Sequence, residues 1–428
     1  MKKLKVALCS VLLLCCGVFL AACASQPLEF DSSKFTVSKQ EVLYDGKAHV
    51  FSVAYQDLDI DVTYSLDGTT FKTAEELNLV DPGVYQVYYK VTLEGYKDYV
   101  SSQVKFEINK NVDVTSADGE TRGYDDLSSA LSEADSGSVV KLHANAEYVK
   151  ALDLDAKNLT IDLCGNKLKF LSNQSSIMQN GSALVIKNGE IVYDISGDGT
   201  KAAFNVNKNC SMVLDNVKMS TNSTALYPRG DAASIRVENS IITAGVYAIA
   251  TNASKENISA SNDAGVKIDL KNSNFLTVGC IVESTGESDH DDCTIIMNVP
   301  GIMTIDNCDI RGDRQAVVVR GGKASITNSC ISYTGLYANK NAYVDSSWRS
   351  GNELVSSAVV VGNRNTGAYQ YEAELTMQNS TISVGNESDR AIYVYQENQN
   401  ASLIASNITF NGTVTNKNGN IQINQKTF

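Results

Sequence analysis

One eight-residue pattern constrains the fold of this chain more than any other feature of its sequence. The pattern reads apolar-x-apolar-x-Asn-x-x-apolar, and it occurs eight times between residues 184 and 410. The intervals between successive asparagines are 28, 23, 33, 35, 21, 51 and 28 residues. Self-similarity on this scale is typical of a solenoid, in which each repeat forms one coil and packs on its neighbours. The repeated asparagines are Asn188, Asn216, Asn239, Asn272, Asn307, Asn328, Asn379 and Asn407.

Apolar and polar residues alternate within the pattern with a period of two, which indicates β-strands and excludes helical repeats. We therefore predict a parallel β-helix, in which each asparagine lies about 4.8 Å above the previous one. Stacked side-chain amides hydrogen-bond to one another, and asparagine tolerates the left-handed backbone conformation of a bend. We interpret the asparagines as structural rather than as a row of sugar-binding amides. A ninth copy, from Ile161 to Leu168, has Gly165 in the place of asparagine.

A second short strand that begins with a small residue is predicted between the copies of the pattern. On this pattern Cys280 takes a position that alanine holds elsewhere, so we expect it to be a buried thiol. The small residue and its apolar neighbour are Ala203-Phe204, Ala225-Leu226, Ala248-Ile249, Cys280-Ile281, Ala316-Val317, Ala358-Val359 and Ala391-Ile392.

Residues 123–134 predict an amphipathic helix that caps the solenoid. Tyr124, Leu127, Ala130 and Leu131 have helical spacing, and an open solenoid end needs a cap because it exposes unpaired strand groups. This helix and the Val139 to Leu142 strand resemble the N-terminal cap of right-handed parallel β-helix proteins of the pectate-lyase-like class. The resemblance covers residues 112–428, and we assign residues 110–428 to this domain. It implies the fold but no single activity, because the class includes lyases, hydrolases, esterases and non-catalytic surface proteins.

Residues 28–109 predict a separate, small β-sandwich, so the fold class is all-β. Short runs rich in β-branched and aromatic residues alternate with turn sequences such as Leu66-Asp67-Gly68 and Asp81-Pro82-Gly83. Tyr44-Asp45-Gly46 and the strand from Gly83 to Val87 resemble bacterial surface Ig-like repeats. This resemblance implies a spacer without chemistry of its own.

The first 22 residues have the features of a signal peptide. Lys2, Lys3 and Lys5 precede an apolar run from Val6 to Leu20 that is short for a membrane span. The following Leu20-Ala21-Ala22-Cys23 resembles the lipobox of bacterial lipoproteins. The resemblance implies that Cys23 is lipidated and becomes the mature N-terminus, with residues 23–27 as a tether. We therefore expect the protein to be anchored in a cell membrane, outside the cytoplasm.

The net charge of the chain makes nucleic acid an unlikely partner. Loss of Lys2, Lys3 and Lys5 with a signal peptide that contains no acidic residue changes the net charge from −13 to −16. Such a surface repels phosphate backbones.

Six cysteines follow the lipobox: Cys164, Cys210, Cys280, Cys293, Cys308 and Cys330. They include no C-x-x-C pair, so neither a zinc knuckle nor a thioredoxin-like site is indicated. Cys308 and Cys330 follow asparagines on consecutive coils, at offsets that differ by one residue. The sequence therefore leaves open whether they form a disulfide.

The candidate catalytic residues lie on the outward side of the asparagine-bearing strands. Asp215 and Glu238 should be neighbours on adjacent coils, with backbones about 4.8 Å apart. Paired carboxyl groups at such separations serve glycoside hydrolases, and Arg236 and Lys271 are near enough to tune their pKa values or hold an acidic sugar. The alternative, which we favour, is a ladder of partly compensated charges on a solvated face.

Two insertions flank this face. The first contains Asp289, Asp291 and Asp292, whose oxygen ligands suit Ca²⁺. A solvated acidic loop is the preferred interpretation, because the spacing is not that of a known calcium loop. The sequence identifies no other cofactor with certainty.

The second insertion, residues 332–374, is rich in aromatic residues, among them Tyr337, Tyr343, Trp348 and Tyr369. They interrupt the coil pattern, so the stacked core does not need them. Such rings stack on sugars or anchor a protein partner. Alternatively, they pack on one another and hold the long loop in place.

Taken together, these features favour a non-catalytic surface lipoprotein whose β-helix presents a binding face to a glycan or a surface protein. A polysaccharide lyase or glycoside hydrolase that acts on the outer face of the β-helix is the second hypothesis. A purely structural envelope protein is the third.

Overall fold

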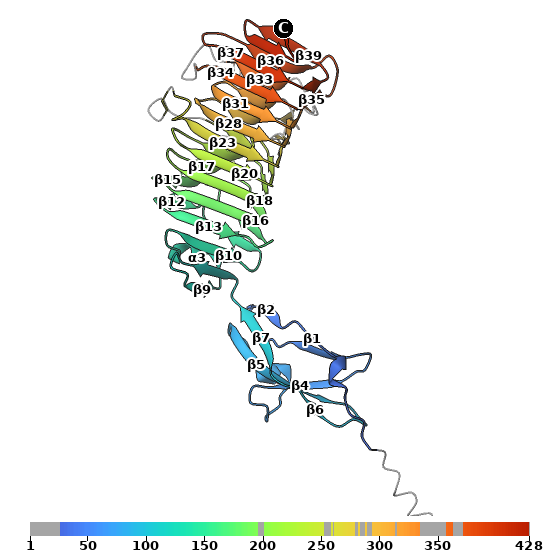
Figure 1. The fold of residues 1–428 in the computed structure, drawn as a ribbon. Helices are drawn as coiled ribbons and strands as arrows, with labels where there is room; N and C mark the ends of the chain where they lie inside the picture. The colour runs from blue at the N-terminus through green and yellow to red at the C-terminus, as the bar shows by residue number, and fades with distance from the viewer. Residues whose placement is uncertain are drawn as a thin grey trace, which may run out of the picture. The chain divides into compact units, whose positions relative to one another are not determined.

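The computed structural model describes residues 26–195, 201–251, 258–259, 261–278, 281–282, 287–288, 293–312, 315–333, 357–362 and 371–427. The regular secondary structure of these residues is almost entirely β-strand, as the sequence predicts. The chain forms two compact units, Met1–Lys110 and Asn111–Phe428 (Figure 1).

The N-terminal unit contains two sheets whose apolar side chains share one core. One sheet is the antiparallel pair of β1 (Phe35–Ser38) and β3 (Ser52–Tyr55). The other has the order β2 (Glu41–Leu43), β7 (Val104–Asn109), β5 (Gly83–Thr92), β4 (Asp61–Ser65), with β6 (Tyr99–Val100) paired to β5. The core includes Phe51, Val87, Val91 and Phe106. The buried Tyr64 hydroxyl donates to the Phe51 carbonyl oxygen at 2.9 Å, so it is satisfied inside this core.

The second unit is a parallel β-helix, as predicted, but each coil has three strands instead of two. The first two strands of each coil belong to a 22-stranded sheet, and the third belongs to a ten-stranded sheet. A bend separates the first two strands, and from the third coil onward it contains one of the eight asparagines. In two coils the bend lies within one long strand. The coils are β10 (Ser138–Leu142), β11 (Ala146–Tyr148), β12 (Asp153–Asp155); β13 (Asn158–Asp162), β14 (Lys167–Phe170), β15 (Ser176–Gln179); β16 (Ala183–Tyr193), β17 (Ala202–Val206); β18 (Ser211–Thr221), β19 (Thr224–Pro228); β20 (Ser234–Glu238), β21 (Ile241–Ala244), β22 (Ile249–Ala250); β23 (Val266–Lys271), β24 (Asn274–Thr277), β27 (Cys293–Met297); β28 (Gly301–Asp306), β29 (Asp309–Gly312), β30 (Gln315–Val319); β31 (Gly322–Thr327), β32 (Cys330–Tyr333), β33 (Ser357–Gly362); β34 (Ala373–Gln378), β35 (Thr381–Val384), β36 (Arg390–Tyr395); and β37 (Ala401–Ser406), β38 (Thr409–Phe410), β39 (Thr413–Lys417).

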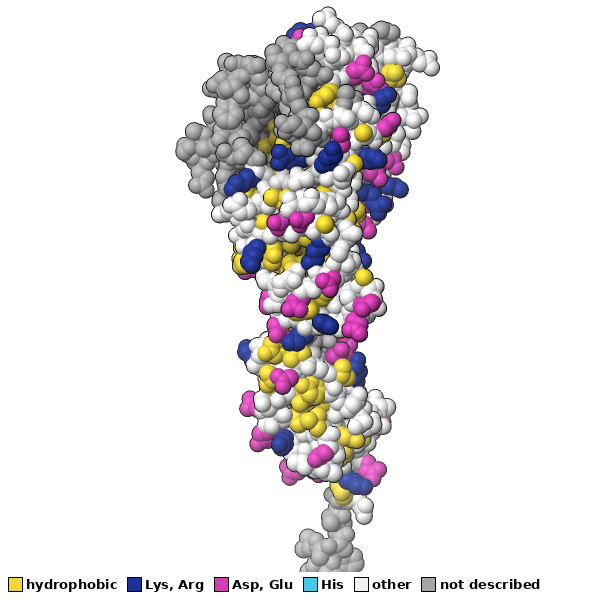
Figure 2. All heavy atoms as spheres, turned by 90° about the vertical axis from the view of Figure 1, so that its left-hand side faces the viewer, with side chains coloured by type: hydrophobic (Ala, Val, Ile, Leu, Met, Phe, Trp, Pro, Cys, Tyr) yellow, Lys and Arg dark blue, Asp and Glu magenta, His cyan; other side chains and the backbone are white. Residues whose placement is uncertain are grey.

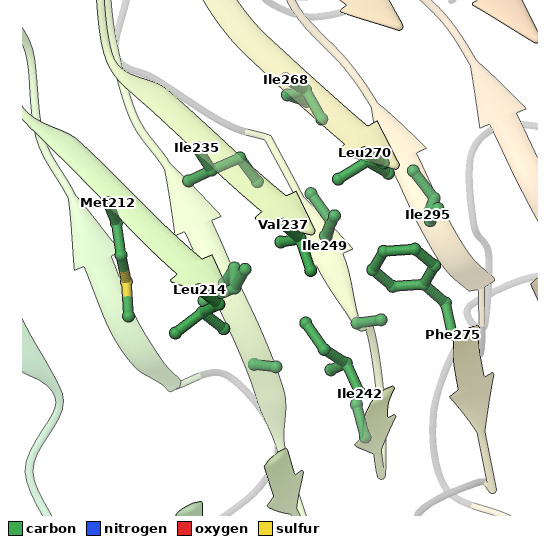
Figure 3. Close-up of a cluster of buried hydrophobic side chains, with 14 of the residues drawn as sticks. Met212, Leu214, Ile235, Val237, Ile242, Ile249, Ile268, Leu270, Phe275 and Ile295 are labelled. Carbon is green, nitrogen blue, oxygen red and sulfur yellow. The ribbon is translucent and has the colours of Figure 1, made fainter. Parts of the chain in front are cut away.

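Equivalent apolar residues of successive coils stack inside the β-helix. Leu214, Val237 and Leu270 are register partners on β18, β20 and β23, and all three are fully buried. Figure 3 shows them meeting Ile249 and Ile295 of the ten-stranded sheet across the interior. Continuous columns of this kind remove apolar surface from water along the whole domain, which is the main stabilising contribution available to a solenoid.

The N-terminal end of the β-helix is capped by a helix and a hairpin. Helix α3 (Leu127–Glu133) buries Leu127, Ala130 and Leu131, and Asp126 caps it by accepting a hydrogen bond from the Ser129 N–H at 2.9 Å. The helix is shorter than predicted, because Tyr124 belongs to β9 (Thr121–Tyr124). Strand β8 (Val112–Thr115) pairs antiparallel with both β9 and β10, so it covers the first strand edge.

Two predicted strand positions are wrong. Gly165 does not replace an asparagine, because the register pairs Ile161 with Ile186 and Leu168 with Ile191. The bend at residues 163–166 is longer by two residues than the bend of the next coil.

The second error concerns the third strand of the coil that contains Asn272. That strand is β27, whose Ile295 pairs with Ile249, so Thr294 takes the small-residue position that we assigned to Cys280. Ile281 belongs instead to a short antiparallel pairing of β25 (Ile281–Val282) with β26 (Glu287–Ser288). Cys280 itself lies outside the described residues.

Candidate functional site

The asparagine bends form a hydrogen-bonded ladder along the β-helix. All eight asparagines have positive φ angles, between 50° and 59°, so each uses the left-handed conformation that asparagine tolerates. Their side chains are bonded to one another: Asn272 Nδ2 lies 3.3 Å from Asn239 Oδ1, and Asn307 Nδ2 lies 2.8 Å from Asn272 Oδ1. The ladder supports the structural interpretation of these residues.

Aspartates interrupt the amide ladder and accept its hydrogen bonds. Asn188 donates to Asp162, Asn239 to Asp215 and Asn328 to Asp306, at 3.1, 3.1 and 2.8 Å. Each aspartate stands immediately before the bend of the preceding coil. Wherever this position is aspartate, the next asparagine bonds to the carboxylate instead of to an amide. Asp215 therefore has a structural role that it shares with two other residues.

Hydrogen bonds lower the pKa of Asp306. The Thr327 hydroxyl donates to its carboxylate at 2.7 Å and the Asn328 amide at 2.8 Å, and Lys271 adds a smaller electrostatic effect. In Asp162, burial acts to raise the pKa, but hydrogen bonds from Asn188, Cys164 and Lys187 outweigh it and lower the pKa.

A second ladder, of buried serines, follows the asparagines and was not predicted. The Ser273 hydroxyl donates to the Lys271 carbonyl at 2.7 Å and accepts from the Ser240 N–H at 3.0 Å. Ser329 and Ser380 make the same two kinds of bond. These hydroxyls satisfy backbone groups at the bend that strand pairing leaves over. The Asn-Ser dipeptide, repeated at four bends, was the available sequence signal.

Cys308 occupies the serine position of its coil. Its Sγ lies 3.3 Å from the Asp306 carbonyl oxygen, and burial raises the pKa of this thiol to about 11. Cys330 is exposed, and both cysteines are free thiols. The disulfide left open by the sequence is therefore not formed.

The predicted catalytic residues lie on the outward side of the first strand of each coil, in two adjacent columns. Asp215 and Glu238 are register partners on β18 and β20, and Glu238 is the partner of Lys271 on β23. Arg236 lies two residues before Glu238, and its guanidinium is 3.8 Å from the Glu238 carboxylate. The sequence thus placed all four on one face, as neighbours.

The acidic and basic side chains of this face differ in whether they form hydrogen bonds or ion pairs. Thr304 donates to the Asp269 carboxylate at 2.8 Å, so this acid, like Asp215 and Asp306, already accepts a hydrogen bond. By contrast, Lys267 and Lys271 on β23 form neither an ion pair nor a hydrogen bond through their ammonium groups within the described part of the chain.

A shallow hollow of about 330 Å³ lies on the outer face of β18, β20, β23 and β28. Val213 and Ile302 supply apolar surface, Arg236, Lys267 and Asp269 supply charge, and Ser211, Ser234 and Thr304 supply hydroxyls. Its volume is at the lower end of the ~300–1,000 Å³ typical of ligand pockets. A second hollow of about 340 Å³ follows the bends, between Asn188, Asn216, Lys218, Asn239 and Ile241.

The outer side of the ten-stranded sheet is different in character. Ile296, Val318 and Val360 are at most 2% exposed, although they point away from the β-helix interior, and they form an apolar cluster with Tyr393 and Tyr395. This side therefore does not present its strands to solvent in the way that β20 and β23 do.

The described residues do not assemble a metal centre or a catalytic histidine site. They contain no group of three or more His, Cys, Asp or Glu residues that could hold a metal ion. His49 of the N-terminal unit pairs with Asp45, and His143 on the first coil of the β-helix pairs with Asp113, both at 2.7 Å. Figure 2 shows one face of the protein, on which acidic and basic side chains are interspersed.

Several predicted residues lie outside the described part of the chain. These are Cys23, the calcium candidates Asp289, Asp291 and Asp292, and the aromatic residues Tyr337, Tyr343, Trp348 and Tyr369. In the residues that the structure describes, no helix has the length and apolar character needed to cross a membrane.

Comparison of the chain with protein-family models, curated proteins and solved structures finds no match.

Proposed function

We propose that this chain is an extracytoplasmic lipoprotein that binds a glycan on the outer face of its β-helix. The lipobox from Leu20 to Cys23 supports the anchor, because two or three acyl chains hold a protein on a membrane far more firmly than one chain. The N-terminal unit, with its Ig-like sequence features, would serve as a spacer.

The observation that carries the binding proposal is the lining of the hollow on β18, β20, β23 and β28. Sugar rings offer hydroxyls at their edges and apolar C–H faces, so a saccharide site needs both kinds of surface. The hollow provides them together: Ile302 is 37% exposed beside the Ser234 and Thr304 hydroxyls. Rigid strands hold these groups in a fixed arrangement, which reduces the entropy lost on binding.

Binding fits this face better than cleavage. Asp215 accepts a hydrogen bond from Asn239, as Asp162 and Asp306 do from their asparagines, so its position is explained without chemistry. The register pairing of Asp215 with Glu238 is nevertheless a specific reason to keep a glycan hydrolase or lyase as the second candidate.

The test offers the mature chain, from residue 23 without its lipid, to a panel of neutral and anionic polysaccharides. Retention and released products are both measured. We expect retention without products, and at least a tenfold loss of affinity in Ile302→Asp, because a carboxylate replaces the apolar part of the hollow. Ile404→Asp is the matched control, since Ile404 is an exposed outward isoleucine of β37, outside the hollow.

The other outcomes separate the alternatives. Products that disappear in Asp215→Asn or Glu238→Gln would establish the enzyme. Retention of no polysaccharide in the panel would contradict glycan binding and favour a structural envelope protein.

A further inference from the structure

We infer that the saccharide bound in the hollow is anionic, and that Lys267 and Lys271 of β23 contact its negative groups. This inference rests on the proposed function and deepens it by naming the class of ligand. The negative groups are carboxylates, as in uronic acids, or phosphates, as in phosphate-linked glycopolymers. Salt screens the net negative charge of the chain beyond about 10 Å at 0.1 M, so the charges next to the hollow decide which groups bind there.

The first argument is the state of the carboxylates on this face. Asp215 accepts from Asn239, Asp269 from Thr304, and Asp306 from Thr327 and Asn328. Each of these three carboxylates has a hydrogen bond that orders the coil surface. A cationic ligand would share their oxygens with these donors, whereas an anionic ligand would contact the cations instead.

The second argument is the state of the cations. Lys267 and Lys271 are exposed, and their ammonium groups form no ion pair or hydrogen bond in the described residues. Arg236, one coil away, lies 3.8 Å from Glu238, which is too long for a hydrogen bond. The ammonium groups of this face are therefore available to a ligand, and each offers three N–H groups.

Two lysines that occupy equivalent outward positions on other coils form ion pairs. Lys323 stacks in register with Lys267, two coils along, and its ammonium pairs with Glu374 at 3.3 Å. Lys187 stacks in register with Lys271, and its ammonium pairs with Asp162 at 3.3 Å. Next to the hollow, by contrast, the ammonium groups of Lys267 and Lys271 have no direct ion-pair partner within the described residues. They are therefore available to contact negative groups of a ligand.

The spacing of these cations suits a polymer with repeated negative charges. Lys267 and Lys271 are four residues apart on one strand, so their backbones are about 13 Å apart. Arg236 lies on the adjacent strand, about 4.8 Å away across the sheet. A polymer lying over the hollow meets positive charge in both directions, and Ile302 and Val213 contact the apolar sides of its sugar rings.

The experiment measures the affinity of the mature chain for three soluble polymers: neutral dextran, a polyuronate and poly(glycerol phosphate). We expect binding to one or both anionic polymers, at least tenfold tighter than to dextran and weakened by salt. Which of the two anionic polymers binds more tightly shows whether the site recognises carboxylate or phosphate groups. In the Lys267→Gln/Lys271→Gln double variant, affinity for that polymer should fall at least tenfold. Lys323→Gln, which removes a lysine of the same column that is already paired, should leave it unchanged.

The outcomes distinguish this inference from the proposed function. Equal affinity for dextran and the anionic polymers, unchanged in the double variant, would keep glycan binding and overturn the anionic class. An equal loss in Lys323→Gln and the double variant would assign the effect to overall charge and overturn the role of β23. No binding to any of the three would overturn both proposals.

Discussion

At the residue scale, the asparagine at each bend combines two properties that no other residue supplies together. It adopts a positive φ at low cost, and its side chain both donates and accepts along the stack. Asn272 illustrates this, because it donates to Asn239 and accepts from Asn307. The sequence repeat therefore carries the bend and the coil-to-coil contact in one side chain.

Substitutions of Asn272 should separate these two contributions. Asn272→Gly keeps the left-handed backbone accessible but loses two amide hydrogen bonds, each worth about 0.5–1.5 kcal/mol. Asn272→Ala loses the same bonds and adds about 1–2 kcal/mol of backbone strain. Thermal unfolding should rank wild type above the glycine variant and the glycine variant above the alanine variant. An alanine variant as stable as the glycine variant would contradict the role of the backbone conformation.

The lowered pKa of Asp306 predicts a specific loss of stability in acid. Its carboxylate is favoured in the folded state, so its contribution is complete above the ordinary pKa of 3.8 and is lost as the pH falls through the lower, folded value. Asp306→Asn keeps an amide oxygen that accepts from Asn328 but removes the titration. The melting temperature of wild type should therefore fall more steeply below about pH 4 than that of the variant. Parallel curves would rule out this contribution.

At the scale of the elements, local patterning predicted the strands that carry the asparagines, because burial on one face enforces a period of two. It failed for the third strand of the Asn272 coil, since Cys280-Ile281 and Thr294-Ile295 both read as a small residue followed by isoleucine. Only the register with Ile249 distinguishes them. The Gly165 error has the same origin, because two extra residues in one bend shift the pattern without changing its appearance.

The candidate site was predicted only in part for a related reason. The outward column of Asp215, Glu238 and Lys271 follows from the repeat. That Asn239 bonds to Asp215 instead of Asn216 depends on side-chain geometry, which the repeat does not encode. The hollow depends on which outward side chains are short, such as Ser211 and Ser234, and therefore on four coils taken together.

The capping helix gives the prediction that belongs to this scale. Leu131 of α3 is 9% exposed and covers the first coil. Leu131→Glu would place a charge against the apolar interior and detach the cap, which exposes strand edges that pair with other molecules. We expect concentration-dependent association in light scattering. Glu133→Gln, at the exposed end of the same helix, should stay monodisperse at the concentrations where wild type does.

At the scale of the whole molecule, the lipobox-like sequence and the β-helix have complementary roles in our proposal. A lipid on Cys23 would fix one end of the chain, and the β-helix would supply the binding surface. An anchored protein meets its glycan at a surface, which favours capture over the action of a diffusing enzyme.

Replacement of Cys23 tests the anchor. In Cys23→Ser the thiol that would accept the lipid is absent, so the protein should leave the membrane fraction and lose the mass of the acyl chains in mass spectrometry. Cys164→Ser, which replaces an exposed thiol of the β-helix, should remain in the membrane fraction. Membrane retention of the Cys23 variant would show that another segment anchors the chain.

The most direct test of the central claim maps where the bound saccharide lies. Acetylation of individual lysines is measured by mass spectrometry with and without a saturating amount of the anionic polymer that binds. Our account predicts that Lys267 and Lys271 become protected, whereas Lys323 and Lys141, an exposed lysine of β10 on the first coil, react at unchanged rates. Protection that spares β23, or that is uniform over all four lysines, would contradict a binding site on this face of the β-helix.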